Sequence, residues 1–391
     1  MNRLVIDLDR LQENIQQVDT LIQNHGASWT LVTKALCGHA ETLKALQLLG
    51  VRSMADSRIE NLRVIERIVP DFESWYLRLP NLSELDSIIE LSDVSLNSEL
   101  RIIKELNERA GERGKTHRII IMIELGDLRE GILPGNLIEF YMNVFDLENI
   151  EVLGIGANVG CLAGAVPSVD QLMQLILYKE LIELKFDQKL SVISAGSSAV
   201  LPLLLEGRVP KAINHFRIGE SVLLGTDLIN GKLIEGLRDD VFTLKAEIVE
   251  IKEKSLIALG ETTSMTPFEV LEENDYSPGQ RGYRAIITVG QLDTNIAGLT
   301  PVDPRFKIAG ASSDVTVVNL GDNDRQLKIG DEIRFRPDYG ALVRLMIGKY
   351  ITKEVRPEIG SFSDHLEPAD EVEVPPVISD DMNDITDPKR K

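Results

Sequence analysis

The sequence is poor in several residue types that mark common protein classes. Two cysteines, Cys37 and Cys161, are too few for a disulfide framework and lack the spacing of a zinc site. Basic residues are fewer than acidic residues, and the formal net charge of -20 argues against binding nucleic acid or an anionic membrane surface. The sequence also lacks a signal segment and an apolar run long enough to span a bilayer, so we expect a cytoplasmic protein.

Short apolar segments alternate regularly with helical segments as far as residue 218. Such alternation implies parallel strands, and eight units predict an α/β fold in which a (β/α)8, TIM-like barrel closes on itself. An open doubly wound sheet is the alternative, but the glycine-rich phosphate loop that usually follows its first strand is absent. The expected strands are Trp29–Lys34, Arg52–Ala55, Trp75–Leu79, Val94–Leu96, Arg118–Leu125, Val152–Ala157, Leu190–Ser194 and Ile213–Ile218.

The sequence changes character near Gly225. Between Val241 and Lys349, β-branched or alternating segments are separated by Gly and Asp turns, and we find no convincing helix. We therefore expect a barrel over residues 1–225, with residues 1–10 outside it and able to pack on the second domain. A smaller all-β C-terminal domain follows over 226–350. Residues 351–391 form an acidic segment that we expect to be poorly ordered.

Lys34 stands at the C-terminal end of the first expected barrel strand. A lysine held there with little water around it can lose its proton and form an imine with a carbonyl compound. A solvated lysine on the rim is the commoner alternative. The location favours chemistry, because the C-terminal ends of barrel strands are where active-site groups gather.

Two small-residue turns follow the seventh and eighth expected strands. They are Ser194–Ala199 and His215–Ser221, and their backbone N–H groups and serine hydroxyls predict an anion site. A phosphate-bearing aldehyde cofactor that needs a lysine imine is pyridoxal 5′-phosphate. The alternative is a phosphosugar barrel with a Schiff-base lysine, but aldolases of that kind carry the lysine on a later strand and lack a β-domain.

Longer runs of the sequence match a known family. The chain resembles the alanine racemase family of pyridoxal phosphate enzymes (fold type III), and within it the ornithine racemase branch. The resemblance extends from about Leu4 to Tyr350. It rests on Ile6–Asp9, Val32–Lys34 with Gly38 and His39, Ala55–Leu62, Ser95–Leu100, Gly126–Gly131 and Asp338–Leu342.

The resemblance implies a role for individual residues. Lys34 would hold the cofactor and act as one base, Arg217 would face the pyridine nitrogen, and Arg129 and Ser313 would contact the substrate carboxylate. It also implies a head-to-tail homodimer, in which the β-domain of one subunit completes the site of the other. The cofactor-binding set would be Lys34, Asn158, Ser197, Ser198, Arg217, Ile218, Gly219 and Tyr339.

The sequence departs from the family pattern at several of these positions. Asn158 and Met122 stand where the resemblance implies a histidine and a lysine, so a support for Arg129 is missing. Gln291 stands in place of the tyrosine that acts as the second base, and glutamine does not carry a proton at neutral pH. Racemisation requires one base for each face of the substrate. The candidates for the second base are Asp293, Tyr339, Cys161, Cys37 and His39.

These residues predict an amino acid racemase that acts on ornithine, alanine or a broad set of amino acids. A basic substrate needs a carboxylate for its distal ammonium, and Asp56, Glu124, Asp127 and Asp314 are available. The alternatives are a decarboxylase, a metal-assisted dehydratase or aldolase, and a non-catalytic cofactor-binding protein. We expect no metal, because the β-domain has no His or Cys to bind one.

Overall fold

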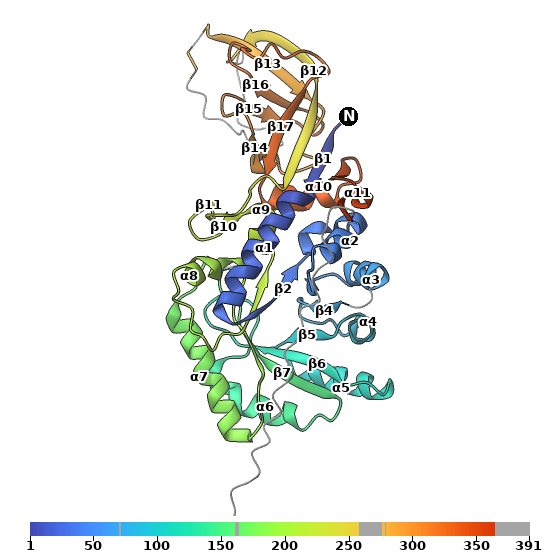
Figure 1. Cartoon of the computed structure of the whole chain (residues 1–391), viewed down its shortest axis with the longest axis vertical. Coiled ribbons are helices and arrows are strands. Elements are labelled where there is room, and N and C mark those ends of the chain that lie inside the picture. The colour runs from blue at the N-terminus through green and yellow to red at the C-terminus, as the bar shows by residue number, and fades with distance from the viewer. Residues whose placement is uncertain (70–71, 161–163, 258–275, 278, 364–391) are drawn as a thin grey trace, which may run out of the picture.

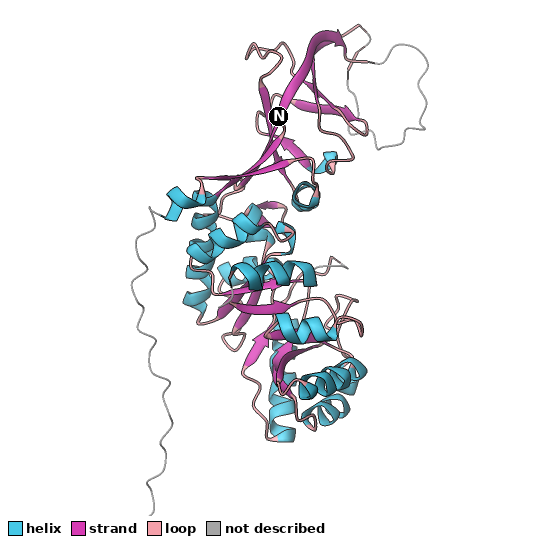
Figure 2. Ribbon diagram, turned by 90° about the vertical axis from the view of Figure 1, so that its right-hand side faces the viewer, coloured by secondary structure: helices cyan, strands magenta, loops and turns pink. Residues whose placement is uncertain are grey.

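The computed structural model describes residues 1–69, 72–160, 164–257, 276–277 and 279–363. Two bodies lie one above the other, with helices around the lower one and mostly strands in the upper one (Figures 1 and 2). Within the described residues, no helix is both long and apolar enough to cross a membrane. We call the lower body the barrel and the upper one the sheet domain.

Eight parallel strands form a closed barrel, as the alternation predicted. The barrel closes where β2 pairs with β9, with Ser28 opposite His215 and Leu31 opposite Ile218. Apolar side chains that alternate along these strands fill the interior, among them Val32, Trp75 and Met122. The strands are β2 (Ser28–Val32), β3 (Ser53–Asp56), β4 (Glu73–Tyr76), β5 (Val94–Asn97), β6 (His117–Met122), β7 (Ile150–Gly156), β8 (Val192–Ser194) and β9 (His215–Ile218).

Helices cover the outside of the barrel and bury apolar side chains against it. In the first of them Leu11, Ile15, Val18 and Ile22 are buried, at the spacing of a helix face. A helix follows the eighth strand too, although the sequence showed it less clearly. The helices are α1 (Leu8–His25), α2 (Ala40–Leu48), α3 (Ile59–Ile68), α4 (Leu85–Leu91), α5 (Leu100–Glu112), α6 (Leu137–Phe145), α7 (Val169–Phe186), α8 (Leu201–Leu205) and α9 (Glu220–Leu224).

The sheet domain is built on a sheet that also includes the N-terminal strand. Its main path runs β14-β17-β12-β13-β16-β15, and β1 (Arg3–Asp7) pairs with β12, so the N-terminal strand lies outside the barrel as predicted. A two-stranded hairpin, β10 (Thr226–Asp227) and β11 (Lys232–Leu233), precedes the sheet. The path strands are β12 (Phe242–Ser255), β13 (Arg281–Ile287), β14 (Leu299–Pro301), β15 (Lys307–Ala311), β16 (Thr316–Asn319) and β17 (Glu332–Pro337).

Two sequence expectations about this region were wrong. A helix, α10 (Tyr339–Ile347), lies where no helix was expected; Asp338 caps it by accepting the Ala341 N–H at 2.7 Å. Its run of apolar residues has too few polar positions to show a helical period. Residues 352–356, assigned to the acidic segment, form β18 (Thr352–Arg356), which pairs in parallel with β1. After α11 (Ile359–Ser363), the rest of that segment lies outside the described residues.

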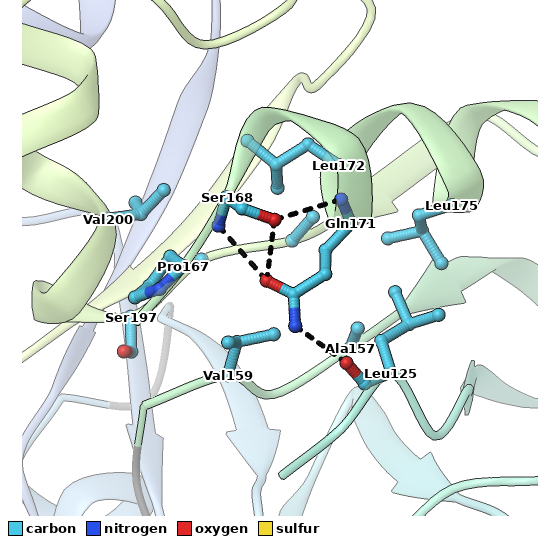
Figure 3. A pocket seen from close by; sticks show the side chains of 12 residues that line it. Leu125, Ala157, Val159, Pro167, Ser168, Gln171, Leu172, Leu175, Ser197 and Val200 are labelled. Atoms are coloured by element: carbon cyan, nitrogen blue, oxygen red, sulfur yellow. Dashed lines mark hydrogen bonds between the residues drawn. The ribbon is translucent and has the colours of Figure 1, made fainter. Parts of the chain in front are cut away.

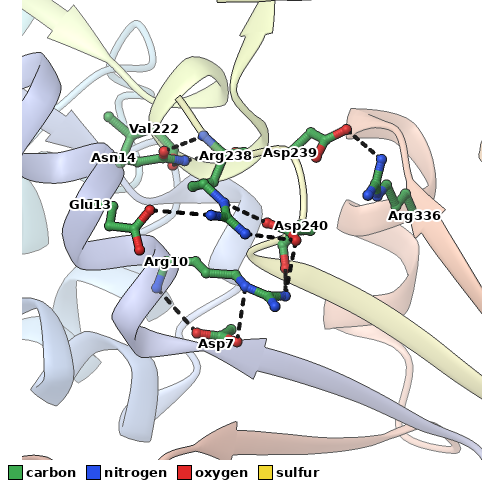
Figure 4. A network of polar contacts seen from close by, with 9 residues as sticks. All are labelled: Asp7, Arg10, Glu13, Asn14, Val222, Arg238, Asp239, Asp240 and Arg336. Carbon is green, nitrogen blue, oxygen red and sulfur yellow. Dashed lines mark hydrogen bonds and ion pairs between the residues drawn. The ribbon is translucent and has the colours of Figure 1, made fainter. Parts of the chain in front are cut away.

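A polar network joins the barrel to the sheet domain (Figure 4). Asn14 of α1 donates to the Val222 and Arg238 carbonyls, each at 2.9 Å, and accepts the Arg238 N–H at 2.6 Å. Arg10 contacts Asp240 at 3.2 Å, and Arg336 of β17 contacts Asp239 at 2.7 Å. The segment that leads into β12 is therefore held from both sides.

Candidate active site

A cavity of about 760 Å³ opens at the C-terminal ends of the barrel strands. We call it the mouth cavity. It brings together most of the site residues that the sequence indicated, although they come from distant parts of the chain. Those on its wall are Lys34, Arg129, Asn158, Ser197, Ser198, Arg217, Gly219 and Tyr339.

Lys34 is the first residue of a short 3-10 helix, η1 (Lys34–Leu36), directly after β2. The preceding Thr33 is buried and fixes this turn, since its hydroxyl donates to Ala55 O at 3.2 Å and to Asp56 at 3.0 Å. The Lys34 side chain is exposed to the cavity, and its Nζ lies 5.9 Å from the centre of the Tyr339 ring. Tyr339 begins α10, so the sheet domain reaches the mouth cavity here.

The two small-residue turns meet around one hydroxyl. Ser198 Oγ accepts the N–H groups of Gly219 at 3.3 Å and Ser221 at 3.2 Å. A Cβ on Gly219 would lie 2.9 Å from Val32, so a larger residue would push the turns apart. Ile218 is fully buried, the last residue of β9, and does not line the cavity. Convergent N–H groups beside a hydroxyl suit a phosphate.

Arg217 is buried at the base of the cavity and its guanidinium is firmly held. It donates to Ser194 O at 2.8 Å, Ser194 Oγ at 2.5 Å, Ala157 O at 3.0 Å and Asn158 Oδ1 at 2.5 Å. The same Ser194 hydroxyl meets His215 Nδ1 at 2.8 Å. Burial, and secondly the charge of Arg217, lower the pKa of His215 to about 3, so this imidazole is neutral at physiological pH.

The loop after β6 presents Arg129, and its backbone is tied down at several points. The Glu124 carboxylate accepts the N–H groups of Leu128 and Arg129, both at 3.2 Å. Gln171 at the start of α7 donates to Leu125 O at 2.7 Å, and the same residue forms a capping box with Ser168 (Figure 3). The Arg129 side chain contacts Glu130 and Asp127, so two carboxylates supply the support that Met122 does not.

The structure does not bring every candidate to the cavity. Asp293 and Ser313 lie together on a turn of the sheet domain formed by residues 290–293 and 312–314, which we call the tip turn. There Asp293 accepts the Gly290 N–H at 2.9 Å, and Leu292 N donates to Ser313 O at 3.0 Å. Neither residue lines the mouth cavity of its own chain.

The sulfur and imidazole candidates for a second base are also poorly placed. Cys37 Sγ lies 3.8 Å from Val343 O against α10, and burial raises the pKa of its thiol. His39 Nδ1 contacts the Thr42 hydroxyl at 2.9 Å, and burial lowers the pKa of its imidazole. Neither lines the mouth cavity. Cys161 lies outside the described residues.

Three of the four carboxylates proposed for a distal ammonium have other partners. Asp56 is buried and accepts from Ser57 N, Arg58 N, Asn61 and Thr33. Burial raises the pKa of its carboxyl, and these hydrogen bonds oppose that rise. Glu124 organises the loop after β6, and Asp127 is buried beside Arg129. Asp314 is exposed on the tip turn.

Two acidic residues of the cavity wall were missed by the sequence reasoning. Glu130 follows Arg129 in a loop, and Glu220 follows Gly219 at the start of α9. Burial raises the pKa of the Glu220 carboxyl, and Asp338 raises it further, while Lys34 opposes both. Each acid stands one residue after a predicted site residue, but charge alone did not distinguish it from the chain's many other acidic residues. In the described residues, no cluster of His, Cys, Asp or Glu has the arrangement of a metal site.

A parallel barrel with a lysine, a buried arginine and an anion-binding turn at one mouth, joined to a mostly antiparallel sheet, is the architecture of an enzyme. The chain belongs to the alanine racemase family: the family described as "Alanine racemase, N-terminal domain" matches residues 6–227. This confirms the family and fold expected from the sequence.

Curated relatives and solved structures agree with this membership. An ornithine racemase from Acetoanaerobium sticklandii is 37% identical over 90% of this chain and 99% of its own length. A lysine racemase from Thermotoga maritima is 31% identical over 91% of this chain and 99% of its own. The alanine racemase structure from Streptomyces coelicolor superposes with a TM-score of 0.70 at 17% identity, covering 91% and 98% of the two chains. The enzyme class is therefore that of the racemases, which are isomerases.

Proposed function

We propose that this protein is a pyridoxal 5′-phosphate-dependent racemase of basic amino acids such as ornithine and lysine. The observation that carries the proposal is that Lys34, Arg217 and the two turns that contain Ser198 and Gly219 meet at one cavity. Full-length similarity to an ornithine racemase and a lysine racemase supports the substrate class.

The residues of the mouth cavity fit the cofactor. Pyridoxal 5′-phosphate, when bound, withdraws electrons from the substrate and so makes its Cα–H acidic. Ser198 and the Gly219 N–H would hold the phosphate, Lys34 would hold the aldehyde carbon, and Arg217 would face the ring nitrogen. An arginine keeps its proton, so the ring nitrogen beside it would stay unprotonated. A less electron-poor ring favours return of the proton to Cα over side reactions.

The protein's own part is to hold the substrate and move two protons. Arg129 would hold the α-carboxylate, which directs the Cα–H bond toward its base. The Lys34 amine would take or return the proton on one face. For the opposite face the chain offers Tyr339 on the cavity wall and Asp293 on the tip turn.

We propose further that two chains form a head-to-tail homodimer. The tip turn does not line the mouth cavity of its own chain, and Leu292 on it is 74% exposed. An exposed leucine beside Ser313 and Asp293 is suited to enter the cavity of a second copy. In that arrangement Ser313 would reach the substrate carboxylate, and Asp314 would be available to the distal ammonium of a basic substrate.

Chiral chromatography of L-ornithine, L-lysine, L-alanine and L-serine after incubation with the holoenzyme tests the activity directly. We expect the D-enantiomer from ornithine and lysine, with deuterium at Cα when the solvent is D2O. An absence of Cα exchange with all four amino acids would contradict racemisation. Release of CO2 would indicate a decarboxylase instead. With Asp314→Asn, the KM should rise for ornithine and lysine but not for alanine.

The two candidates for the second base can be separated by exchange from each enantiomer. Loss of the second base should abolish exchange from one enantiomer and spare it for the other, since Lys34 still serves one face. We expect this one-sided loss with either Tyr339→Phe or Asp293→Asn, and the variant that shows it identifies the base. Two variants that both exchange the two enantiomers equally would exclude both residues.

A further inference from the structure

The Glu130 carboxylate accepts two hydrogen bonds from the side chain of Arg129 in the mouth cavity. Both Arg129 Nε and one terminal nitrogen donate to the Glu130 carboxylate, the latter at 2.8 Å. The Glu130 side chain is 11% exposed and that of Arg129 is 38% exposed. A carboxylate that holds one edge of the planar guanidinium fixes the direction of the whole group.

The same carboxylate also holds an amide from another strand end. Asn158, which follows β7, donates through Nδ2 to Glu130 Oε1. The other end of that amide, Oδ1, accepts from Arg217 at 2.5 Å. The amide therefore lies between an anion and a cation, and the two charges determine which way it points. Glu130 is thus connected to both arginines, directly to Arg129 and through Asn158 to Arg217.

An ordinary surface ion pair between neighbouring residues would not have these features. Such pairs are exposed and contribute little, because water screens them. Glu130 is mostly buried, lines the cavity and bonds to a residue 28 positions away. Arg129 also has Asp127 at 3.7 Å, so the guanidinium stands between two carboxylates that come from its own loop.

We propose that Glu130 is the positioning residue of this site, which sets Arg129 for the substrate carboxylate and Arg217 for the cofactor. This inference rests on the proposed function for the roles of the two arginines. Without the Glu130 charge, Arg129 regains alternative rotamers, and the Asn158 amide loses the anion that orients it. One substitution should therefore weaken two binding steps that occur at different places in the cavity.

The test compares Glu130→Gln with Glu139→Gln, a change at an exposed glutamate on α6 outside the cavity. Binding of propionate, a carboxylate that lacks an amino group, is titrated in each holoenzyme. Binding of pyridoxal 5′-phosphate is titrated in each apoenzyme. We expect E130Q to weaken propionate about ten- to a hundredfold, the loss of a charged hydrogen bond, and to weaken the cofactor less. E139Q should match wild type in both titrations.

A second measurement separates positioning from simple loss of charge. If Glu130 acts through Arg129, then E130Q in an Arg129→Lys background should add little to the loss of propionate binding. Glu130→Asp should restore part of the affinity, because it restores the charge at a shorter reach. In the amino acid reaction, KM should rise more than kcat falls.

The outcome that overturns the proposal can be seen without any activity. A crystal structure of E130Q with Arg129 and Asn158 in unchanged positions, and propionate bound as in wild type, would show that Glu130 positions neither. Fully additive effects of E130Q and R129K would do the same. An absence of racemisation by wild type, with ligand binding still sensitive to Glu130, would instead contradict the proposed function alone.

Discussion

The barrel and the sheet domain place their site residues in different ways. Lys34, Asn158, Ser198 and Arg217 come from four strand ends and still meet, because parallel strands in a closed barrel all finish at the same rim. Among the described residues of the sheet domain, Tyr339 at the start of α10 reaches that rim. The domain's other candidates lie on the tip turn, fixed to one another by backbone hydrogen bonds. The barrel half of the proposed site is therefore formed within one chain. The tip turn of the sheet domain, by contrast, does not line the cavity of its own chain.

The largest effect is expected in the barrel half. Lys34→Ala should lower racemisation at least about a thousandfold, because the variant loses both a proton carrier and the proposed anchor of the cofactor. Chiral chromatography measures the rate. Borohydride reduction with pyridoxal 5′-phosphate, followed by peptide mass spectrometry, should label wild type at Lys34 and leave K34A unlabelled. Lys349→Ala, at an exposed lysine beyond α10, is the control. If K34A were still active, Lys34 would not be a catalytic residue.

The next effect concerns the sheet half. Leu292→Asp would place an unpaired charge in the proposed interface, which costs several kcal/mol. We expect a monomer by light scattering. We also expect activity to fall about a hundredfold, which corresponds to a free-energy cost of about 2.7 kcal/mol. The control is Leu184→Asp on α7, where a leucine that is 87% exposed lies on the outside of the barrel. It should leave both properties unchanged.

Mixed dimers of two inactive variants test whether one subunit completes the site of the other. K34A lacks the barrel half, and Asp293→Ala alters the tip turn. If one subunit completes the site of the other, co-expression of the two chains should produce mixed dimers with one intact site each and measurable activity. Verified mixed dimers without activity would mean that each chain uses its own tip turn. An Asp293→Ala enzyme that is active alone would mean that the reaction does not need the tip turn.

A difference in acid stability should also separate the two bodies. Burial lowers the pKa of His215 to about 3 and that of His117 to about 4, and both lie in the barrel. The unfolded state then binds more protons than the folded state. Stability is therefore lost as pH falls below about 6.5, by up to about 1.4 kcal/mol per pH unit for each histidine. Residues 226–363 contain no histidine. Urea denaturation and regional hydrogen exchange from about pH 7 to about pH 5 should show the barrel opening first.

His215→Asn should make the pH dependence shallower and is the informative comparison. Asp56 acts in the opposite direction, since burial raises the pKa of its carboxyl and its protonation favours the fold. The slope of each variant is therefore more informative than the total stability. Equal slopes for wild type, His215→Asn and His117→Asn would exclude the histidines as the cause.

The smallest effect is expected between the two bodies. Arg336 contacts Asp239 at 2.7 Å, and both side chains are about 40% exposed. Arg336→Ala should lower the free energy of unfolding by at most about 1 kcal/mol and leave activity unchanged, because water screens such pairs. Thermal unfolding measures the first and chiral chromatography the second. A large loss of activity would show that the relative position of the bodies controls the site.

Much of the fold could be predicted because its signals are local. The barrel strands are short apolar runs at regular intervals, and α1 shows its apolar face at Leu11, Ile15, Val18 and Ile22. The helix α10 could not be predicted, since its apolar run suits a buried strand as well. The β18 strand was missed because its acidic and basic residues resemble the segment that follows it, and only pairing with β1 makes it a strand.

The sequence by itself determined which residues could do chemistry: a lysine at a strand end, two small-residue turns and an arginine within the second of them. Tertiary structure alone decided what the acidic side chains near these groups contact. Asp56 became an acceptor for the turn after β3, Asp293 a cap of the tip turn, and Glu130 a link between Arg129 and Asn158. A charge in a sequence has no partner until folding brings one within hydrogen-bond distance. Some of these partners are near in the chain, such as Arg58 and Gly290, whereas Asn158 comes from another strand end.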